Sequence, residues 1–416
     1  MHQILNFTIY FFLFLTLYFQ IFMLVTFIEE RFFSRKKVKS VRGAYVPSVS
    51  IIVPAWNEER TIGGTLKSLL ALDYPKDKLN ILVVDDGSKD STLLRAREFG
   101  VDSRVKVLTK ENGGKYTALN LALTHIETDL VGCLDADSFV DAGALWEIVA
   151  YFENLEVMAV TPMIRVHEPR GIVQRMQNIE YILGALIRKV FGYLNALYVT
   201  PGPFSIYRRE VFKKIGDYKH AHHTEDLEMA LRMQSHRLRI ENAERAVVYT
   251  VAPKTVRVLF KQRVRWIHGF LENARDYSHL LFRRSYGNLG VFSLPFAVVS
   301  IFTAIFFAGY IFYIGGARIY EKYIEVAAVG MSHYFNWSFS FDWFFLKTDP
   351  QSIMKYMIAV LMLAMIVGGV WLVRIKKVHT IALDTVFFLA LYGLIAPFWL
   401  LRSVYGVAFS KKTRWR

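Results

Sequence analysis

The sequence contains a single cysteine, Cys133, among 416 residues. One thiol cannot form an intramolecular disulfide, and it cannot build a site in which several thiolates hold a metal ion. Negative charge is also scarce, since 51 lysines and arginines face 36 aspartates and glutamates, for a net charge of +15. We interpret Cys133 as a core residue of a strand, and the excess of cations requires an explanation of its own.

The glycine-rich motifs that cradle phosphates are missing as well. No Gly-x-Gly-x-x-Gly follows the first predicted strand, which disfavours a dinucleotide site of the Rossmann type. The run Asn112-Gly113-Gly114-Lys115 lacks the spacing of a P-loop. His222, His223 and His268 have no thiolate nearby in the sequence, and we therefore disfavour a zinc site.

Apolar residues, by contrast, are abundant. They make up 53% of the chain, and the mean hydropathy of +0.27 lies above the usual range of soluble proteins. Runs long enough to cross about 30 Å of hydrocarbon lie at residues 4–28, 291–313, 356–373 and 381–401. The first run lacks a basic start and a small-residue cleavage site, so we predict a permanent span rather than a signal peptide.

The membrane also explains the excess of cations. Basic residues follow the first run directly, as they do in cytosolic loops; they are Arg31, Arg35, Lys36, Lys37, Lys39 and Arg42. We therefore predict a multi-pass protein of the inner or plasma membrane, with a cytosolic domain and no nucleic-acid partner. The expected division is a transmembrane helix at 1–30, a cytosolic domain at 45–280, and transmembrane and interfacial helices at 288–410.

The predicted topology contains a conflict. If the N-terminus lies outside the cell, four spans place the C-terminus outside as well. The loop at 374–377 and the tail at 411–416 are nevertheless both basic, as cytosolic segments are, and consecutive loops cannot lie on the same side. An additional interfacial or re-entrant helix within residues 315–349, a stretch with several Phe and Trp residues, would resolve it.

The region after the first span predicts an α/β sheet. Short β-branched apolar runs at residues 49–53, 79–84, 105–108 and 130–134 indicate strands, and helical patterns follow the first three. Strands that alternate with helices form a mostly parallel, Rossmann-like sheet with flanking helices. Such sheets bind ligands beyond the carboxyl ends of their strands, which is where the polar residues of this chain fall.

Two acidic islands follow predicted strands. Asp85 and Asp86 precede Gly87-Ser88, a pattern that turn chemistry and capping explain when it stands alone. Asp135 and Asp137 follow the fourth predicted strand, and on an extended segment carboxylates at this spacing point to the same side. Acidic loops on one sheet edge repel unless a cation lies between them, so the second pair predicts a Mg²⁺ or Mn²⁺ site that faces a diphosphate.

A third acidic island, Thr224-Glu225-Asp226, opens a predicted helix. Capping by the threonine and the helix dipole explain such residues without any function. The dipole is expected to lower the pKa of a carboxyl here, which leaves an ionised but weak base. A hydroxyl acceptor needs only a positioned base for its proton, and we assign that role to Asp226.

A fourth island lies shortly before the second apolar run. Gln262, Arg265 and Trp266 are spaced i, i+3 and i+4, so they share one face of a helix. An amide, a guanidinium and an indole on one stripe suit a phosphate beside a stacked sugar ring. An amphipathic helix at the membrane, with a snorkelling arginine and an interfacial tryptophan, is the alternative that stays open.

In this order the four islands resemble those of the membrane-embedded processive β-glycosyltransferases of family 2, which include cellulose, chitin, hyaluronan and poly-N-acetylglucosamine synthases. The resemblance covers roughly residues 49–273 and the flanking spans. It implies a GT-A fold and inverting transfer of a sugar from a UDP-sugar to a growing polysaccharide at the cytosolic face of the membrane. Thr224-Glu225-Asp226 is more similar to the poly-N-acetylglucosamine and cellulose branches, and no gating-loop motif of the cellulose enzymes is evident, which favours N-acetylglucosamine.

The resemblance also implies a role for each residue. It implies a nucleotide and donor site made of Ala55, Asn57, Glu58, Asp86, Lys115, Asp135 and Arg265. It implies a metal site for Mg²⁺ or Mn²⁺ at Asp137 with Asp135, and a catalytic site at Asp226 with Glu225. Contacts to the acceptor are implied for Gly202, Pro203, Gln262 and Trp266. Because few spans leave little protein to enclose a polymer, export of the product would call for a partner protein or a homo-oligomer.

Three other interpretations remain open on the sequence. A non-processive transferase would glycosylate a lipid carrier in the same membrane. A transporter would use the cytosolic domain only to sense a nucleotide. A catalytically inactive scaffold would not need intact acids at all three acidic islands, which speaks against it.

Overall fold

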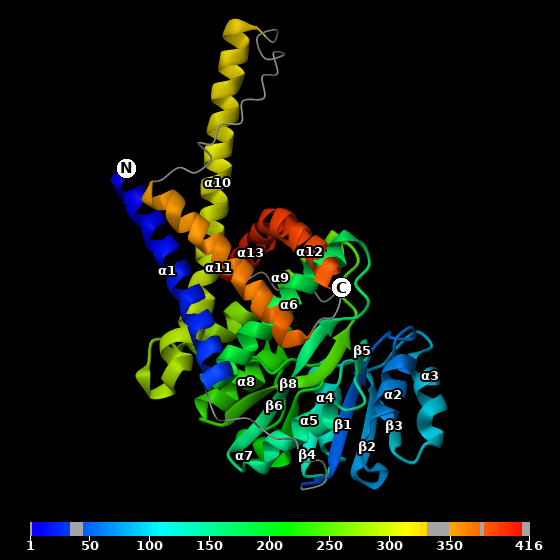
Figure 1. Cartoon of the computed structure of the whole chain (residues 1–416). Coiled ribbons are helices and arrows are strands. Elements are labelled where there is room, and N and C mark those ends of the chain that lie inside the picture. Colours follow the sequence, from blue (N-terminus) through cyan, green and yellow to red (C-terminus); the bar gives the residue numbers. More distant parts are fainter. Residues whose placement is uncertain (1, 34–44, 331–348, 375–377, 410–416) are drawn as a thin grey trace.

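The computed structural model describes residues 2–33, 45–330, 349–374 and 378–409. Its centre is an eight-stranded sheet in the order β3-β2-β1-β4-β7-β6-β8-β5 (Figure 1). The strands are β1 (Val49–Ala55), β2 (Leu79–Asp85), β3 (Val105–Thr109), β4 (Leu130–Cys133), β5 (Ser138–Val140), β6 (Val157–Val166), β7 (Ile206–Arg208) and β8 (Arg239–Thr250).

The four strands predicted from the sequence form the parallel half of this sheet. β1 pairs in parallel with β2 on one side and with β4 on the other, and β2 pairs in parallel with β3. The register sets Ala55 beside Asp85 and Asp85 beside Thr109, so the carboxyl ends of three strands meet at one edge. The prediction of a mostly parallel α/β sheet is confirmed.

The other half of the sheet is mixed. β7 runs antiparallel to β4 and to β6, β5 runs antiparallel to β8, and β6 and β8 pair in parallel. None of the strands β5, β6, β7 and β8 was predicted from the sequence. β8 begins with the sequence Arg-Ile-Glu-Asn-Ala-Glu-Arg, and this polar pattern does not indicate a strand.

Helices cover both faces of the sheet. They are α2 (Ile62–Leu70), α3 (Thr92–Glu98), α4 (Lys115–Leu123), α5 (Ala144–Val149), α6 (Gly171–Tyr193), α7 (Arg209–Ile215), α8 (Glu225–Ser235) and α9 (Val256–Asp276). Neighbouring residues of β1 point to opposite faces: Ile51 is buried in one core with Leu66 of α2, and Ile52 in the other with Leu119 of α4. Cys133 is 4% exposed at the end of β4, which confirms its assignment as a core residue.

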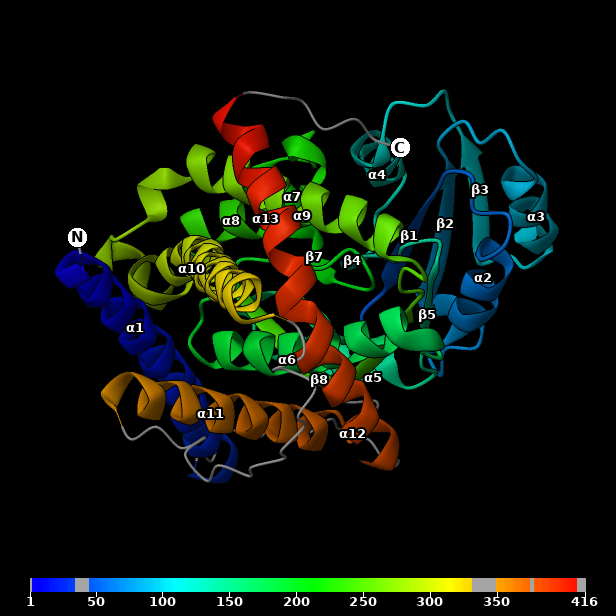
Figure 2. The ribbon, with the colours of Figure 1, turned by 90° about the horizontal axis from the view of Figure 1, so that it is seen from above.

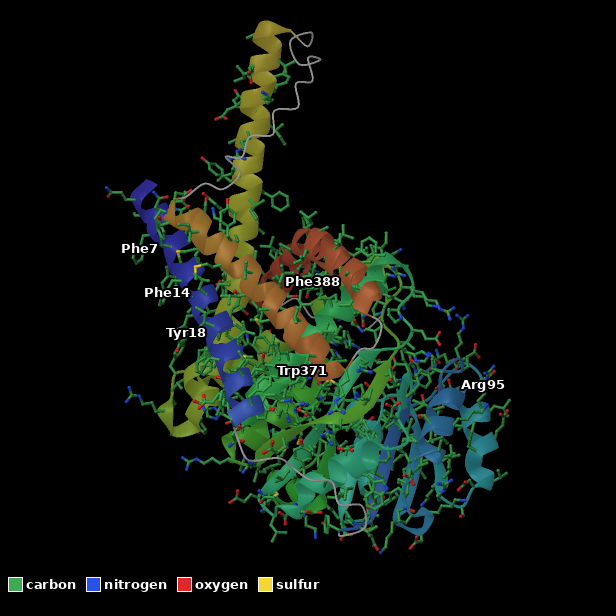
Figure 3. The ribbon with its side chains drawn as sticks, in the orientation of Figure 1. Phe7, Phe14, Tyr18, Arg95, Trp371 and Phe388 are labelled. Atoms are coloured by element: carbon green, nitrogen blue, oxygen red, sulfur yellow. The ribbon has the colours of Figure 1, made fainter. Side chains whose placement is uncertain are left out.

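Among the residues that the structure describes, four apolar stretches have the length and composition to cross a membrane: Gln3–Phe33, Leu289–Ala328, Pro350–Val373 and Ile381–Ala408. They contain α1 (His2–Ile28), α10 (Leu294–Val329), α11 (Pro350–Val373), α12 (Val378–Phe387) and α13 (Gly393–Ala408). Figure 3 labels Phe7, Phe14 and Tyr18 along α1, and these side chains are 72%, 63% and 49% exposed. Such an apolar surface indicates that lipid covers it.

The second apolar stretch is longer than predicted. α10 has 36 residues, which corresponds to about 54 Å of helix, and Figure 1 shows it projecting far from the sheet. Residues 315–329 continue α10, so this part of 315–349 is not a separate helix. The remainder of that stretch, most of the basic cluster after α1, the loop residues 375–377 and the basic tail lie outside the described residues. The side of the membrane on which each segment lies therefore stays a prediction.

The last apolar stretch contacts the domain that contains the sheet. A π-helical turn, η11 (Phe388–Tyr392), joins α12 to α13. In Figure 2, α10 is seen nearly end-on while α13 lies lengthwise across α6 and α9. The Ser403 hydroxyl of α13 donates to the Val264 carbonyl of α9 at 3.2 Å, and the Asn178 amide of α6 donates to Asp384 of α12 at 2.8 Å. The C-terminal stretch is thus joined to α6, which lies between β6 and β7 in the chain, and to α9, which follows β8.

Candidate active site

The second and third polar islands meet at Lys115, the first residue of α4. Its ammonium lies 2.7 Å from the Asp135 carboxylate beyond β4 and 2.9 Å from the Glu225 carboxylate at the start of α8. Burial would lower the pKa of Lys115, but the two carboxylates hold it well above its usual value. Asp135 and Glu225 follow Lys115 by about 20 and about 110 residues in the chain. All three nevertheless lie together where parallel sheets bind ligands.

Asp226 lies beside this cluster. Its Oδ1 accepts a hydrogen bond from the Leu227 backbone N–H at 2.9 Å. Burial and the neighbouring Glu225 carboxylate raise the pKa of Asp226 to about 6, although Lys115 opposes them. The expectation that the helix dipole lowers this pKa is wrong, because burial and a like charge outweigh the dipole of the first turn. Asp226 is therefore ionised at neutral pH and more basic than expected.

Thr224 does not cap α8 with its side chain, contrary to the simplest interpretation of the sequence. Its hydroxyl donates to the Ala221 carbonyl at 3.1 Å and accepts from the Asn273 amide of α9 at 2.9 Å. A Cβ added at Gly269 would clash with that hydroxyl oxygen, so α9 packs directly against the acidic island. The two helices therefore fix the position of Glu225 and Asp226 together.

The turn before α8 has an unusual backbone. Ala221, His222 and His223 have φ values of 45°, 51° and 66°, in the left-handed region that non-glycine residues rarely adopt. Strained residues of this kind persist only where surrounding contacts enforce them. Asn273 supplies one such contact through the Ala221 carbonyl at 3.2 Å, and a hydrogen bond of 2.9 Å between His222 Nε2 and the Asp276 carboxylate supplies another.

β4 ends at Cys133 rather than at residue 134. Asp135 and Asp137 lie in the turn that follows this strand. Burial, then the Asp135 and Glu58 carboxylates, raise the pKa of Asp137 to about 7. Within the described residues, no group of three or more His, Cys, Asp or Glu side chains is arranged to hold a metal ion alone. A crowded carboxylate pair does fit a divalent ion whose remaining ligands come from a diphosphate and water.

Asp86 holds the loop that leads to Lys115. Its carboxylate accepts from the backbone N–H groups of Gly113 and Gly114, at 3.0 and 2.9 Å, and from the Lys110 ammonium at 2.8 Å. Only 3% of Asp86 is exposed. The loop Asn112-Gly113-Gly114-Lys115 is thus fixed by a carboxylate, and a contact between Asp86 and a nucleotide stays a prediction.

The residues after β1 that are predicted to contact the nucleotide are hydrogen-bonded to the loop after β2. The Ala55 carbonyl accepts from the Asp86 backbone N–H at 2.9 Å. The Asn57 backbone N–H donates to the Ser88 hydroxyl at 3.0 Å, and the Glu58 backbone N–H donates to the Thr92 hydroxyl at 2.7 Å. Hydrogen bonds therefore join Ala55, Asn57 and Glu58 to the first acidic island and the start of α3, and Glu58 is close enough to Asp137 to influence its pKa.

The turn that contains Gly202 and Pro203 faces the centre of the cluster. A Cβ at Gly202 would lie 2.8 Å from the Lys115 ammonium and 2.9 Å from the Asp135 carboxylate. Nearby, the Thr200 hydroxyl donates to the Asp226 carbonyl at 2.8 Å. The predicted acceptor loop is therefore adjacent to the predicted base and donor residues.

The fourth island joins the cluster through Arg265. Burial would raise the pKa of Glu225, but Lys115 and, more weakly, Arg265 hold it below its usual value. This proximity favours a binding role for the stripe over a purely snorkelling arginine. Gln262 and Trp266 lie on the same helix, and both are in contact with Arg263, a residue that the sequence analysis did not single out.

Comparison with known proteins identifies the family. Residues 47–269, more than half of the chain, match the family described as "Glycosyltransferase like family 2". The chain is similar to poly-beta-1,6-N-acetyl-D-glucosamine synthases of Staphylococcus epidermidis, with 30% identity over 272 residues, and of Staphylococcus aureus (strain COL), with 28% over 273 residues. Each match spans 64% of this chain and 65% of the relative, which is less than two thirds of the relatives' length.

A solved structure has a similar fold over nearly the whole chain. The mannosyltransferase PcManGT from Pyrobaculum calidifontis, in complex with GDP-Man and Mn²⁺, superposes with a TM-score of 0.58 at 19% identity, covering 98% of this chain and 97% of that one. This likeness extends to the apolar helices and agrees with the GT-A fold expected from the resemblance. From the match over residues 47–269, the chain belongs to the family 2 glycosyltransferases.

Proposed function

We propose that this protein transfers N-acetylglucosamine from a UDP-sugar to a growing polysaccharide, with inversion, at the cytosolic face of the membrane. The observation that carries the proposal is the convergence of Lys115, Asp135, Glu225 and Asp226, from three separate segments, at the carboxyl edge of the parallel strands. The similarity to poly-N-acetylglucosamine synthases supports the choice of sugar and of product.

In the proposed reaction Asp226 is the base. The acceptor hydroxyl attacks the anomeric carbon on the side opposite the diphosphate, and Asp226 removes its proton as the new bond forms. One base is sufficient for inversion, so no second carboxylate has to act as a nucleophile. Lys115 and Arg265 place positive charge beside the acids, where it can stabilise the departing diphosphate.

The donor site is proposed to hold Mg²⁺ or Mn²⁺. Asp137, with Asp135 beside it, would bind the ion, and the raised pKa of Asp137 shows how poorly this carboxylate is neutralised by the protein alone. When bound, the ion would neutralise charge that develops on the leaving group. Ala55, Asn57, Glu58 and Asp86 are proposed to contact the nucleotide.

The acceptor is proposed to lie between the Gly202-Pro203 turn and the stripe of Gln262 and Trp266. An indole offers a flat apolar face for a sugar ring, and Trp266 is 36% exposed. We further propose that residues 45–280 lie in the cytosol, that residues 1–30 and 288–410 provide the membrane helices, and that export requires a partner or a second copy of the chain.

Gly202→Ala is expected to lower the rate of transfer by about 10- to 100-fold, with little change in melting temperature. The new methyl group would displace the Lys115 ammonium and the Asp135 carboxylate, both of which are the ends of side chains and move at small cost in stability. Initial rates of UDP release and thermal unfolding would be measured together. Gly100→Ala, at a position with no atom within 4 Å of the new group, is the control, and equal rates for both variants would contradict the predicted crowding at Gly202.

The pH dependence should report the state of Asp226. Because its pKa is raised to about 6 and the base must be ionised, kcat/KM is expected to fall as the pH drops through about 6. The profile would be recorded with saturating divalent ion, which suppresses protonation of the carboxylates that bind it. An acidic limb near pH 4 would contradict the raised pKa of Asp226, because kcat/KM reports the ionisation of the free enzyme.

The function is tested by incubating membranes that contain the full chain with a panel of UDP-sugars and Mg²⁺ or Mn²⁺. We expect UDP release that is greatest with UDP-N-acetylglucosamine and a product many sugars long. A lipid that carries a single sugar would instead support the non-processive alternative. Absence of UDP release with every donor would refute the proposal.

A further inference from the structure

Arg263 is a buried cation that contacts both residues of the predicted acceptor stripe. It is 3% exposed and lies on α9 between Gln262 and Trp266. One terminal nitrogen donates to the Gln262 side-chain oxygen at 2.7 Å, and the guanidinium carbon lies 4.3 Å from the centre of the Trp266 ring. Because its oxygen is occupied, the Gln262 amide is left with its two N–H donors for another partner.

The other terminal nitrogen of Arg263 is held by α6. It donates to one oxygen of Glu180 at 2.7 Å, and the second oxygen of Glu180 accepts from the Tyr392 hydroxyl at 3.1 Å. Arg263 therefore has little freedom to rotate, since charge-assisted hydrogen bonds are short and directional. Glu180 thus connects Arg263, which contacts the acceptor stripe, to Tyr392 in the C-terminal apolar stretch.

Tyr392 occupies a distinctive position in that stretch. It is the last residue of η11, the π-helical turn between α12 and α13, and its ring lies 4.9 Å from that of Phe388 and 5.5 Å from that of Trp399. Phe388 is labelled in Figure 3, on the helices above α6. Turns of this type are rare and occur often at functional sites. A shift of α12 against α13 would move the Tyr392 hydroxyl and hence Glu180.

Stability alone does not account for this arrangement. A buried ion pair loses its hydration on folding, and well-packed apolar side chains of similar size are often as stabilising. What the pair provides is a defined orientation for Arg263, and through it for the Trp266 ring and the Gln262 amide. The Asn178 and Asp384 hydrogen bond of 2.8 Å reinforces the same junction between α6 and α12.

We propose that Arg263 is a positioning residue for the acceptor, and that Glu180 and Tyr392 couple it to the C-terminal membrane stretch. Acceptor binding and the arrangement of α12 and α13 are then linked, so that a change in one alters the other. The proposal rests on the proposed function, because the stripe binds an acceptor only if the protein transfers sugar to a glycan.

The test uses the full chain in nanodiscs and the variants Tyr392→Phe and Glu180→Gln. The KM for an N-acetylglucosamine oligosaccharide and the acceptor-independent hydrolysis of UDP-N-acetylglucosamine would be measured for each. Tyr392→Phe is expected to raise the acceptor KM by about threefold to tenfold, the effect of one lost hydrogen bond, and Glu180→Gln by more. Donor hydrolysis should stay within about twofold, because neither residue touches the acid cluster. Tyr313→Phe, at a tyrosine that is 70% exposed on α10, is the matched control.

A double-mutant cycle separates positioning from a general structural role. With Arg263→Gln already present, Tyr392→Phe is expected to have almost no further effect on the acceptor KM. An unchanged acceptor KM in Tyr392→Phe, with or without a lower melting temperature, would overturn the proposal. Equal effects of Tyr392→Phe in both backgrounds would overturn the coupling through Arg263. If the wild-type chain hydrolyses donor but extends no acceptor, both the coupling and the proposed function fail, whereas failure in the variants alone concerns the coupling.

Discussion

Asp226→Asn should lower the rate of transfer by about 10²- to 10⁴-fold, the range for loss of a general base. The amide has nearly the shape of the carboxylate and can still accept from the Leu227 backbone N–H, but it cannot take a proton. Glu225 cannot take over readily, because Lys115 lies 2.9 Å from its carboxylate and holds its pKa low. The substitution also removes one negative charge from a crowded buried cluster, so folding should be unharmed or improved.

The measurement is the initial rate of UDP release at saturating donor and acceptor, together with thermal unfolding in the presence and absence of UDP. Stabilisation by UDP should persist in Asp226→Asn, which would show that the donor site is intact. Asp217→Asn makes the same chemical change at an exposed position and should leave the rate unaltered. A protein that only senses a nucleotide would bind UDP equally well and lose no activity in Asp226→Asn, so near wild-type turnover would reject the assignment of the base.

The parallel half of the fold could be predicted because its signal is local. Each of the four strands β1 to β4 is a short apolar run that ends in polar residues, and parallel pairing places those ends together whatever the details of packing. The apolar helices could be predicted equally well, since about 20 consecutive apolar residues strongly indicate a membrane-spanning helix. Their lengths were less certain, as α10 shows by continuing to Val329.

The contacts that define the candidate site could not be predicted, because they join distant segments. No pattern in the sequence indicates that Lys115 bridges Asp135 and Glu225, or that Gly202 lies against the Lys115 ammonium and the Asp135 carboxylate. The pKa of Asp226 was predicted in the wrong direction for the same reason. The helix dipole is a local property, whereas burial and the charge of neighbours depend on tertiary structure.

Arg263 illustrates a further limit of reasoning from one sequence. It stands next to Gln262 and three residues before Trp266, yet the helical spacing alone does not show which partner its guanidinium takes. Its importance follows only from Glu180, some 80 residues earlier, and from Tyr392 in the last apolar stretch. Residues that position others carry no chemical signature of their own.

Lys115→Met is expected to lower the free energy of unfolding by about 3 kcal/mol and to abolish transfer. Methionine is of similar length, but it leaves Asp135 and Glu225 without the cation that now lies between them. The cost should be below the upper range for buried pairs, because 23% of the Lys115 side chain is exposed. Denaturant unfolding at several pH values would measure it, with Lys213→Met, on the exposed side of α7, as the control.

The pH dependence of this loss distinguishes electrostatics from packing. Without Lys115 the folded-state pKa values of the neighbouring carboxyls rise above their unfolded values, so the folded variant binds more protons than the unfolded chain does. Its stability then falls as the pH rises, and the deficit should be larger at pH 8 than at pH 5. Adding Glu225→Gln should restore part of the stability of Lys115→Met, because it removes one of the two unpaired charges. It should not restore transfer, since the cation beside the diphosphate is still missing. A deficit that is independent of pH and unaffected by Glu225→Gln would mean that Lys115 acts through packing, and that the acids are not held together by its charge.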